Sequence, residues 1–125
     1  MEKQSRIYVA GHRGMVGSAI WRALERKGYS NLAGKSSAEL DLLDPAAVDA
    51  FFRAEQPEYV VLAAARVGGI GANNTYRGQF IYENTQIELN VIHAAYRHGA
   101  EKLLYLGSSC IYPKRAPQPL KEEFL

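Results

Sequence analysis

Cysteine is almost absent from this sequence of 125 residues, and the single one, Cys110, has no partner for an internal disulfide. No apolar run approaches the ~20 residues that a membrane-spanning helix requires. Residues 1–5 lead directly into a strand-like stretch and lack the apolar core of a signal peptide. These absences predict a protein of the cytoplasm that has no contact with a membrane.

The sequence also lacks a large excess of positive or negative charge. The sequence has 15 Lys and Arg against 13 Asp and Glu, which gives a formal net charge of +2, and no basic tract gathers the positive side chains. Nucleic acid is therefore not an expected partner. With 47% hydrophobic residues, a chain of this length can bury the core of one domain, and we find no internal repeat or low-complexity segment.

Short apolar segments alternate with helical patterns along the chain. The predicted strands are 6–10, 31–33, 59–63 and 102–106, and the predicted helices are 15–27, 44–55 and about 79–97. Parallel strands need such crossovers, and the crossovers are right-handed. The sequence therefore predicts an α/β fold, a Rossmann-type doubly wound parallel sheet of about four strands in the order 3-2-1-4.

The predicted domain covers residues 6–112, and the composition of the sequence changes after it. Three prolines lie between 113 and 119, and the chain stops without a recognisable cap. We expect residues 113–125 to be the start of a connecting segment, with the remainder of a larger enzyme absent.

A glycine-rich motif carries the strongest chemical signal. It runs Gly11-His12-Arg13-Gly14-Met15-Val16-Gly17, directly after the first strand and at the start of a helix. Such glycines can serve a tight strand-to-helix turn alone, but this context favours a dinucleotide, because the helix start offers free amides to a pyrophosphate. Asp41 and Asp44 form an acidic pair after the second strand, where an adenine-contacting residue is expected, and Leu42 is also predicted to contact the cofactor.

The charges near the motif favour NADP over NAD. Arg13 lies in the glycine loop, Lys35 follows the second strand, and no acidic residue ends that strand to bind a ribose 2′-hydroxyl. Lys35 is equally consistent with a phosphate-binding residue and with a solvated surface charge.

Small or polar residues end the last two predicted strands. Ala63, Ala64 and Ala65 leave room for a cofactor across the sheet edge, although close helix packing also favours alanine. The loop 66–74 is glycine-rich, as in a pocket wall or a flexible connector. We expect 106–110 to lie at the switch point between strands 1 and 4, beside the nicotinamide.

Within that last segment, Leu106 and Gly107 are predicted to contact the cofactor, while Ser108 and Cys110 are candidate catalytic residues by position. Taken by itself, a lone cysteine is more often a buried structural thiol. The residues alone leave both interpretations of Cys110 open.

Four segments together, 9–19, 62–70, 73–76 and 106–113, closely resemble the GDP-L-fucose synthase family of extended short-chain dehydrogenases/reductases. The glycine motif is common to the whole extended class. The Val67-Gly68-Gly69 loop and the run from Ser108 to Pro113 are far more particular to this family. The resemblance covers nearly the whole chain.

The resemblance implies an enzyme that epimerises C3 and C5 of GDP-4-keto-6-deoxy-D-mannose and then reduces the C4 ketone with NADPH. It implies that Cys110 removes the proton beside the ketone and that Ser108 hydrogen-bonds the ketone oxygen. It further implies a GDP-sugar as substrate and a homodimer of the intact enzyme, paired through long helices.

The sequence departs from the family at one decisive point. None of its eight tyrosines is followed by lysine four positions later, so the catalytic Tyr-x-x-x-Lys is absent. Ser37 also stands where the family often has a basic residue. We expect the chain alone to be inactive, and two alternatives stay open: another sugar-nucleotide epimerase or dehydratase, and a non-catalytic dinucleotide-sensing module.

Overall fold

The computed structural model describes all residues from 1 to 125 and consists of a small parallel sheet between helices. Its elements in chain order are β1 (Ile7–Ala10), α1 (Met15–Arg26), β2 (Leu32–Ala33), α2 (Pro45–Glu55), β3 (Tyr59–Leu62), α3 (Ile70–Thr75), α4 (Arg77–Arg97) and β4 (Lys102–Tyr105), followed by 3₁₀ turns at Ser109–Ile111 and Glu122–Phe124. The predicted α/β fold is confirmed, and each predicted strand and helix is present. The helix α3, inside the glycine-rich loop, was not predicted.

The predicted strand order 3-2-1-4 is wrong, because the sheet has the order β2-β1-β3-β4. β2 pairs with β1 at only two positions, whereas β3 pairs with β1 at four, from Ile7 opposite Tyr59 to Ala10 opposite Leu62. A four-residue strand gains more ladder hydrogen bonds beside β1 than beside a two-residue strand. The switch point therefore lies between β1 and β3, and β4 lies one strand further away than expected.

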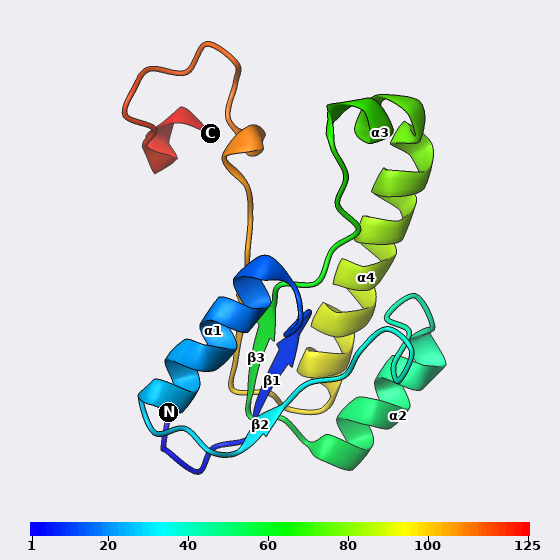
Figure 1. Ribbon diagram of the computed structural model, residues 1–125, viewed down its shortest axis with the longest axis vertical. Coiled ribbons are helices and arrows are strands. Elements are labelled where there is room, and N and C mark those ends of the chain that lie inside the picture. Colours follow the sequence, from blue (N-terminus) through cyan, green and yellow to red (C-terminus); the bar gives the residue numbers. More distant parts are fainter.

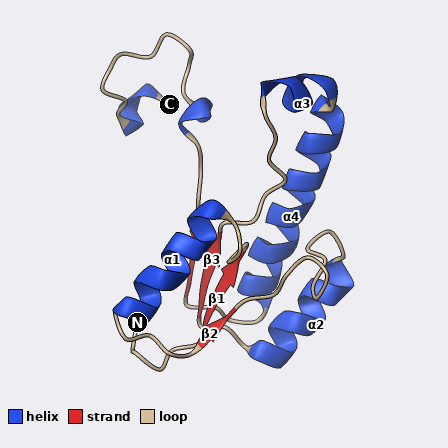
Figure 2. Ribbon diagram, in the orientation of Figure 1, coloured by secondary structure: helices blue, strands red, loops and turns tan.

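The domain has three layers, with α1 on one face of the sheet and α2 and α4 on the other (Figure 2). The main core lies on the side of α2, where the ring of Tyr8 packs on Phe51 at 4.6 Å and on Phe52 at 5.7 Å between centroids. Burial raises the pKa of the Tyr8 phenol well above its usual range. All four residues of β1 are buried, as expected for the central strand of a doubly wound sheet.

α2 begins where the sequence predicts. Asp44 is its N-cap and accepts hydrogen bonds from the amides of Ala46 at 2.9 Å and Ala47 at 3.2 Å, with Pro45 in the first turn. Asp44, part of the acidic pair that the sequence placed near the adenine, is therefore a helix cap.

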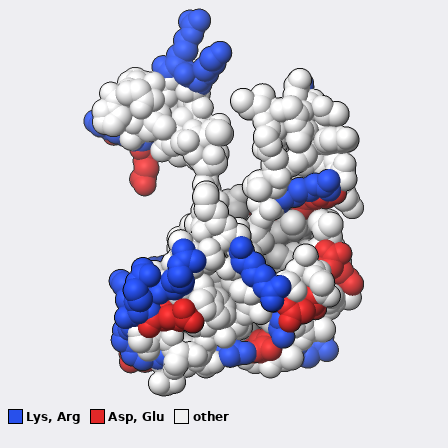
Figure 3. Space-filling view, viewed as in Figure 1, with Lys and Arg blue, Asp and Glu red and all other residues white.

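The upper half of α4, with α3, projects beyond the sheet, and the chain after β4 leaves the sheet as an extended segment that ends in the second 3₁₀ turn (Figure 1). On the face in Figure 3, acidic side chains lie among the basic ones over the sheet and its helices. No helix of the structure is both long and apolar enough to cross a membrane.

Candidate functional site

The glycine loop between β1 and α1 is closed so tightly that it leaves no room for a side chain at Gly11 or Gly17. Gly11 has φ +80°, and a Cβ there would lie 2.8 Å from the carbonyl oxygen of Ala63. A Cβ on Gly17 would lie 2.1 Å from the carbonyl oxygen of Gly11. These two glycines bring β1, α1 and the end of β3 together, and the backbone of the loop is left open to a ligand.

The start of α1 presents unpaired amides beside this loop. Gly14 is the N-cap and supplies no side-chain cap, and the first turn has no acidic residue. The amides of Met15, Val16 and Gly17 donate to no backbone or side-chain acceptor. Three free amides at the positive end of a helix dipole form an anion-binding site of the kind that binds pyrophosphate.

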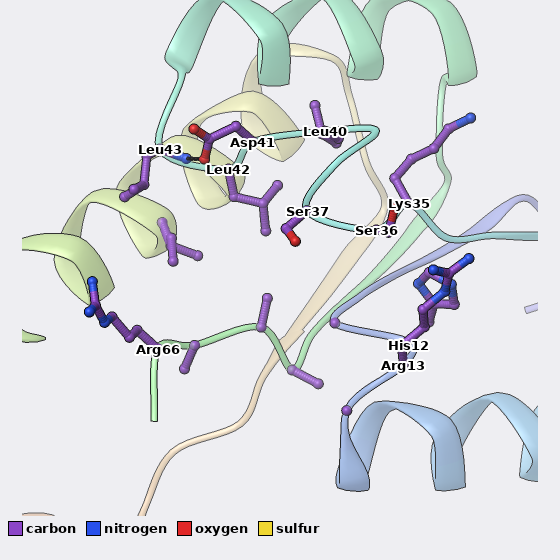
Figure 4. Close-up of a pocket in the computed structure, with 16 residues that line it drawn as sticks. His12, Arg13, Lys35, Ser36, Ser37, Leu40, Asp41, Leu42, Leu43 and Arg66 are labelled. Atoms are coloured by element: carbon purple, nitrogen blue, oxygen red, sulfur yellow. Dashed lines mark hydrogen bonds between the residues drawn. The ribbon is translucent and has the colours of Figure 1, made fainter. Parts of the chain in front are cut away.

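A pocket of about 540 Å³ opens between the glycine loop, the segment after β2 and the end of β3 (Figure 4). Ten of the predicted cofactor residues line it: Gly11, His12, Arg13, Gly14, Lys35, Asp41, Leu42, Ala63, Ala64 and Ala65. Five others do not: Met15, Val16, Gly17, Leu106 and Gly107. Met15 is 87% exposed and lies outside the set of residues that line the pocket, beside which its amide is free.

Arg13 and Lys35 lie on one side of the pocket, and Arg66 lies on the other (Figure 4). Asp41 also lines it, with its carboxylate accepting a hydrogen bond from the amide of Leu43 at 2.9 Å. Glu39 was not predicted to belong to the site, but its carboxylate accepts hydrogen bonds from Ser36 near Arg13 and Lys35.

His12 fills a gap behind the loop. Its ring packs against Trp21 of α1 at 5.3 Å between centroids, and a Cβ on Gly34 would lie 2.6 Å from its Cγ atom. Its Nδ1 atom is buried and has no hydrogen-bond partner. The only tryptophan of the chain thus lies in contact with the glycine loop.

Hydrogen bonds and an ion pair join the loop after β3 to α4. The side chain of Asn84 accepts from the amide of Arg66 at 2.6 Å and donates to its carbonyl oxygen at 3.0 Å, while the Arg66 guanidinium pairs with Glu83 at 2.5 Å. Arg66 also lies over the ring of Phe80, which packs beneath Gly68. These hydrogen bonds hold the pocket wall formed by 63–66.

Six further residues line the pocket without having been predicted to bind the cofactor: Ser36, Ser37, Leu40, Leu43, Arg66 and Ile87. Leu40 and Ile87 are ordinary core-type positions, and no local pattern sets them apart. Ser36 with Glu39 is different, because Ser-x-x-Glu is a recognisable capping pattern that could have been found.

Ser108 and Cys110 lie together but outside the cofactor pocket. Ser108 Oγ accepts from the amide of Cys110 at 3.2 Å, and the Cys110 thiol is exposed. Cys110 lines a separate groove of about 670 Å³ that faces Asn84 and Glu88 of α4. The expected place at the switch point is wrong, because β3 separates β4 from β1.

The residues present fit a bound dinucleotide. Gly11 and Gly17 leave no room for a Cβ, the amides at the start of α1 are free, and three cationic side chains line the pocket beside them. The fold and this site define a Rossmann-type dinucleotide-binding domain. The chain belongs to the NAD dependent epimerase/dehydratase family, whose model matches residues 7–125.

Three similarities are more particular. The chain is 61% identical over 124 residues to GDP-L-fucose synthase 1 of Arabidopsis thaliana, covering 99% of this chain and 38% of that protein. It is 58% identical over 125 residues to the GDP-L-fucose synthase of Escherichia coli (strain K12), covering 100% and 39%. The GDP-mannoheptose C4 reductase of Campylobacter jejuni, solved with NADP bound, superposes with a TM-score of 0.95 at 46% identity, covering 100% and 40%. The chain thus spans about two-fifths of the length of these proteins.

Proposed function

We propose that this chain is the cofactor-binding part of a GDP-L-fucose synthase, which converts GDP-4-keto-6-deoxy-D-mannose to GDP-L-fucose by 3,5-epimerisation and NADPH-dependent 4-reduction. The observation that carries the proposal is the pocket beside the glycine loop, with its free amides and with Arg13 and Lys35 at one side. Relatives named GDP-L-fucose synthase, at 58–61% identity, support the substrate.

NADP is the proposed cofactor. The amides of Met15 to Gly17 would bind the pyrophosphate, and Arg13 and Lys35 would bind a 2′-phosphate. Ala63, Ala64 and Ala65 would leave room for the adenosine beside Asp41 and Leu42. Leu106 and Gly107, outside the pocket, would contact the cofactor nearer its nicotinamide end. When bound, the cofactor supplies the hydride for the ketone.

The proton chemistry is assigned to the segment after β4. We propose that the Cys110 thiolate removes the proton beside the C4 ketone, because the neighbouring carbonyl stabilises the resulting enolate. The Ser108 hydroxyl would donate a hydrogen bond to the ketone oxygen; its own oxygen already accepts from the Cys110 amide, which fixes its direction. The exposed thiol, facing the groove beside α4, is accessible to a sugar.

The first test measures cofactor binding through the fluorescence of Trp21. Because Trp21 contacts His12 in the loop, bound NADPH is expected to quench its emission. Gly11→Ala should abolish the quenching, since a Cβ there meets the backbone at Ala63. Unchanged emission in the folded wild-type chain, together with no heat of binding by calorimetry, would refute a dinucleotide site.

The second test is turnover of GDP-4-keto-6-deoxy-D-mannose with NADPH, by the 125-residue chain and by the product of the full reading frame that contains it. We expect no turnover by the chain alone, which has no Tyr-x-x-x-Lys. In an active product, Cys110→Ser should stop solvent deuterium exchange at C3 and C5 and leave NADPH binding intact.

Two other outcomes correspond to other functions. Reduction without exchange at C3 and C5 would favour another sugar-nucleotide enzyme, as the similarity to a C4 reductase also suggests. Cofactor binding without turnover of any GDP-sugar by any product of the gene would favour a dinucleotide-sensing module.

We further propose that the intact enzyme is a homodimer paired through α4. Tyr82, Leu89, Ile92 and Tyr96 are 42–82% exposed on this helix and recur at helical spacing. Sedimentation of the intact protein with Leu89→Lys would test this, since a lysine there should yield monomers. The exposed thiol of Cys110 suits the reducing cytoplasm, the proposed compartment.

A further inference from the structure

A single helical turn after β2 carries a carboxylate that lies beside the proposed phosphate site. Glu39 reaches back to Ser36, and its Oε2 accepts from the Ser36 amide at 2.8 Å and from the Ser36 hydroxyl at 2.6 Å. The amides of Glu39 and Leu40 in turn donate to the Ser36 carbonyl oxygen, at 3.0 and 2.9 Å. The bond from the Ser36 amide to the Glu39 carboxylate is one half of a capping box; in place of the other half, the Ser36 hydroxyl donates to the same carboxylate.

The turn lies at the cationic side of the pocket. Ser36 lines the pocket beside Lys35, and Arg13 approaches from the glycine loop (Figure 4). The hydrogen bonds from the Ser36 side chain and amide lower the pKa of the exposed Glu39 carboxyl, and the charges of Arg13 and Lys35 lower it further. Glu39 is therefore ionised at neutral pH, and its negative charge acts on both cations.

A 2′-phosphate bound by Arg13 and Lys35 would share these cations with Glu39. The carboxylate offsets part of their positive potential and repels the dianion directly. An adenosine with a free 2′-hydroxyl carries no charge at that position and is insensitive to Glu39. At the 2′ position the charge of Glu39 therefore acts on NADP alone, while the pyrophosphate common to both cofactors is affected equally.

We propose that Glu39 is a specificity-determining residue that lowers the preference of this pocket for NADP over NAD, while its hydrogen bonds to Ser36 hold the turn that follows Lys35. The inference rests on the proposed dinucleotide function and adds to it a residue that opposes the two cations. The capping role and the charge are separable, because a glutamine at this position still accepts both hydrogen bonds from Ser36.

The experiment compares dissociation constants of NADP and NAD, by calorimetry at low and high salt, for the wild-type chain and Glu39→Gln. We expect the variant to bind NADP roughly twofold to tenfold more tightly and NAD unchanged, with the gain shrinking as salt screens the charges. Glu122→Gln, an equal change of net charge in the C-terminal segment, is the matched control and should change neither constant.

A second variant covers the event that the turn is disturbed. Glu39→Ala removes the charge and the cap together, so both affinities fall, but the ratio of the NAD to the NADP dissociation constant should still rise. A ratio that stays constant or falls in both variants would overturn the proposal and leave Glu39 a structural cap. A wild-type chain that binds neither cofactor would instead refute the dinucleotide function itself.

Discussion

The carbonyl oxygen of Gly11 lies 2.1 Å from the position that a Cβ on Gly17 would occupy. Gly11 directly follows β1 and Gly17 lies in the first turn of α1, and this approach fixes how the helix leaves the strand. It also directs the amides of α1 toward the pocket. Both the fold and the anion site therefore depend on the absence of one methyl group.

Gly17→Ala is expected to push α1 away from β1 and to weaken both folding and NADP binding. Overpacking at such a site costs about 1–3 kcal/mol, and the displaced amides should raise the NADP dissociation constant more than tenfold. Gly78→Ala, in α4 with no atom within 4 Å of its Cβ position, is the control and should not destabilise the protein. Urea unfolding and calorimetric titration of the two variants would decide the matter.

Lys35→Met should reduce the affinity for NADP roughly fivefold to fiftyfold and leave NAD binding nearly unchanged, because only NADP carries the phosphate that this cation would bind. The isosteric apolar stem of methionine preserves the packing of the side chain. Lys114→Met, in the segment after β4, removes the same charge elsewhere. Equal weakening of NADP and NAD would show that Lys35 shapes the pocket and does not select the phosphate.

The glycine motif and the parallel strands were predictable, because a tight strand-to-helix turn depends on residues that are adjacent in the sequence. The strand order was not, since it depends on how long β2 is, and only two of its residues pair with β1. β2 ends at Ala33, and at the next residue, Gly34, a side chain would meet the ring of His12. A contact between residues 12 and 34 has no local signature.

The candidate site shows the same division. Arg13, Lys35 and the three alanines were predicted from their distance to strand ends, which fixes the sheet edge they occupy. Arg66 was not predicted as a lining residue, because its position depends on Asn84, 18 residues further along the chain. Ser108 and Cys110 were placed too near the switch point, since their position follows from the strand order.

Asn84→Leu should loosen the wall of the cofactor pocket. The substitution removes the two hydrogen bonds that Asn84 makes to the exposed backbone of Arg66, at a cost of about 0.5–1.5 kcal/mol each in unfolding free energy. The dissociation constants of both cofactors should rise together, because the wall would contact the adenosine that they share. Thr85→Leu, at the neighbouring exposed position, should have neither effect. A selective loss of one cofactor would contradict this role of Asn84.

Asp49 joins α2 to the end of α4 and should make the fold sensitive to acid. Its carboxylate contacts His98 Nε2 at 2.9 Å, Arg53 at 2.5 Å and Arg97 at 3.3 Å. The hydrogen bond with His98 lowers the pKa of Asp49 below its ordinary value of 3.8. The hydrogen bond with Arg53 and the charge of Arg97 lower this pKa further. A carboxyl whose pKa is lower in the folded state stabilises the fold above its unfolded pKa, and this contribution is lost as the pH falls through the folded pKa.

Asp49→Asn tests this linkage. At neutral pH the variant should unfold at lower urea concentration than the wild type, because the asparagine cannot pair with Arg53 and Arg97. Below about pH 4 the difference should shrink, since the wild-type carboxyl becomes neutral there as well. Glu122→Gln should follow the wild type throughout. A gap between Asp49→Asn and wild type that stays constant down to about pH 2 would mean that the shape of the side chain, and not its charge, joins the two helices.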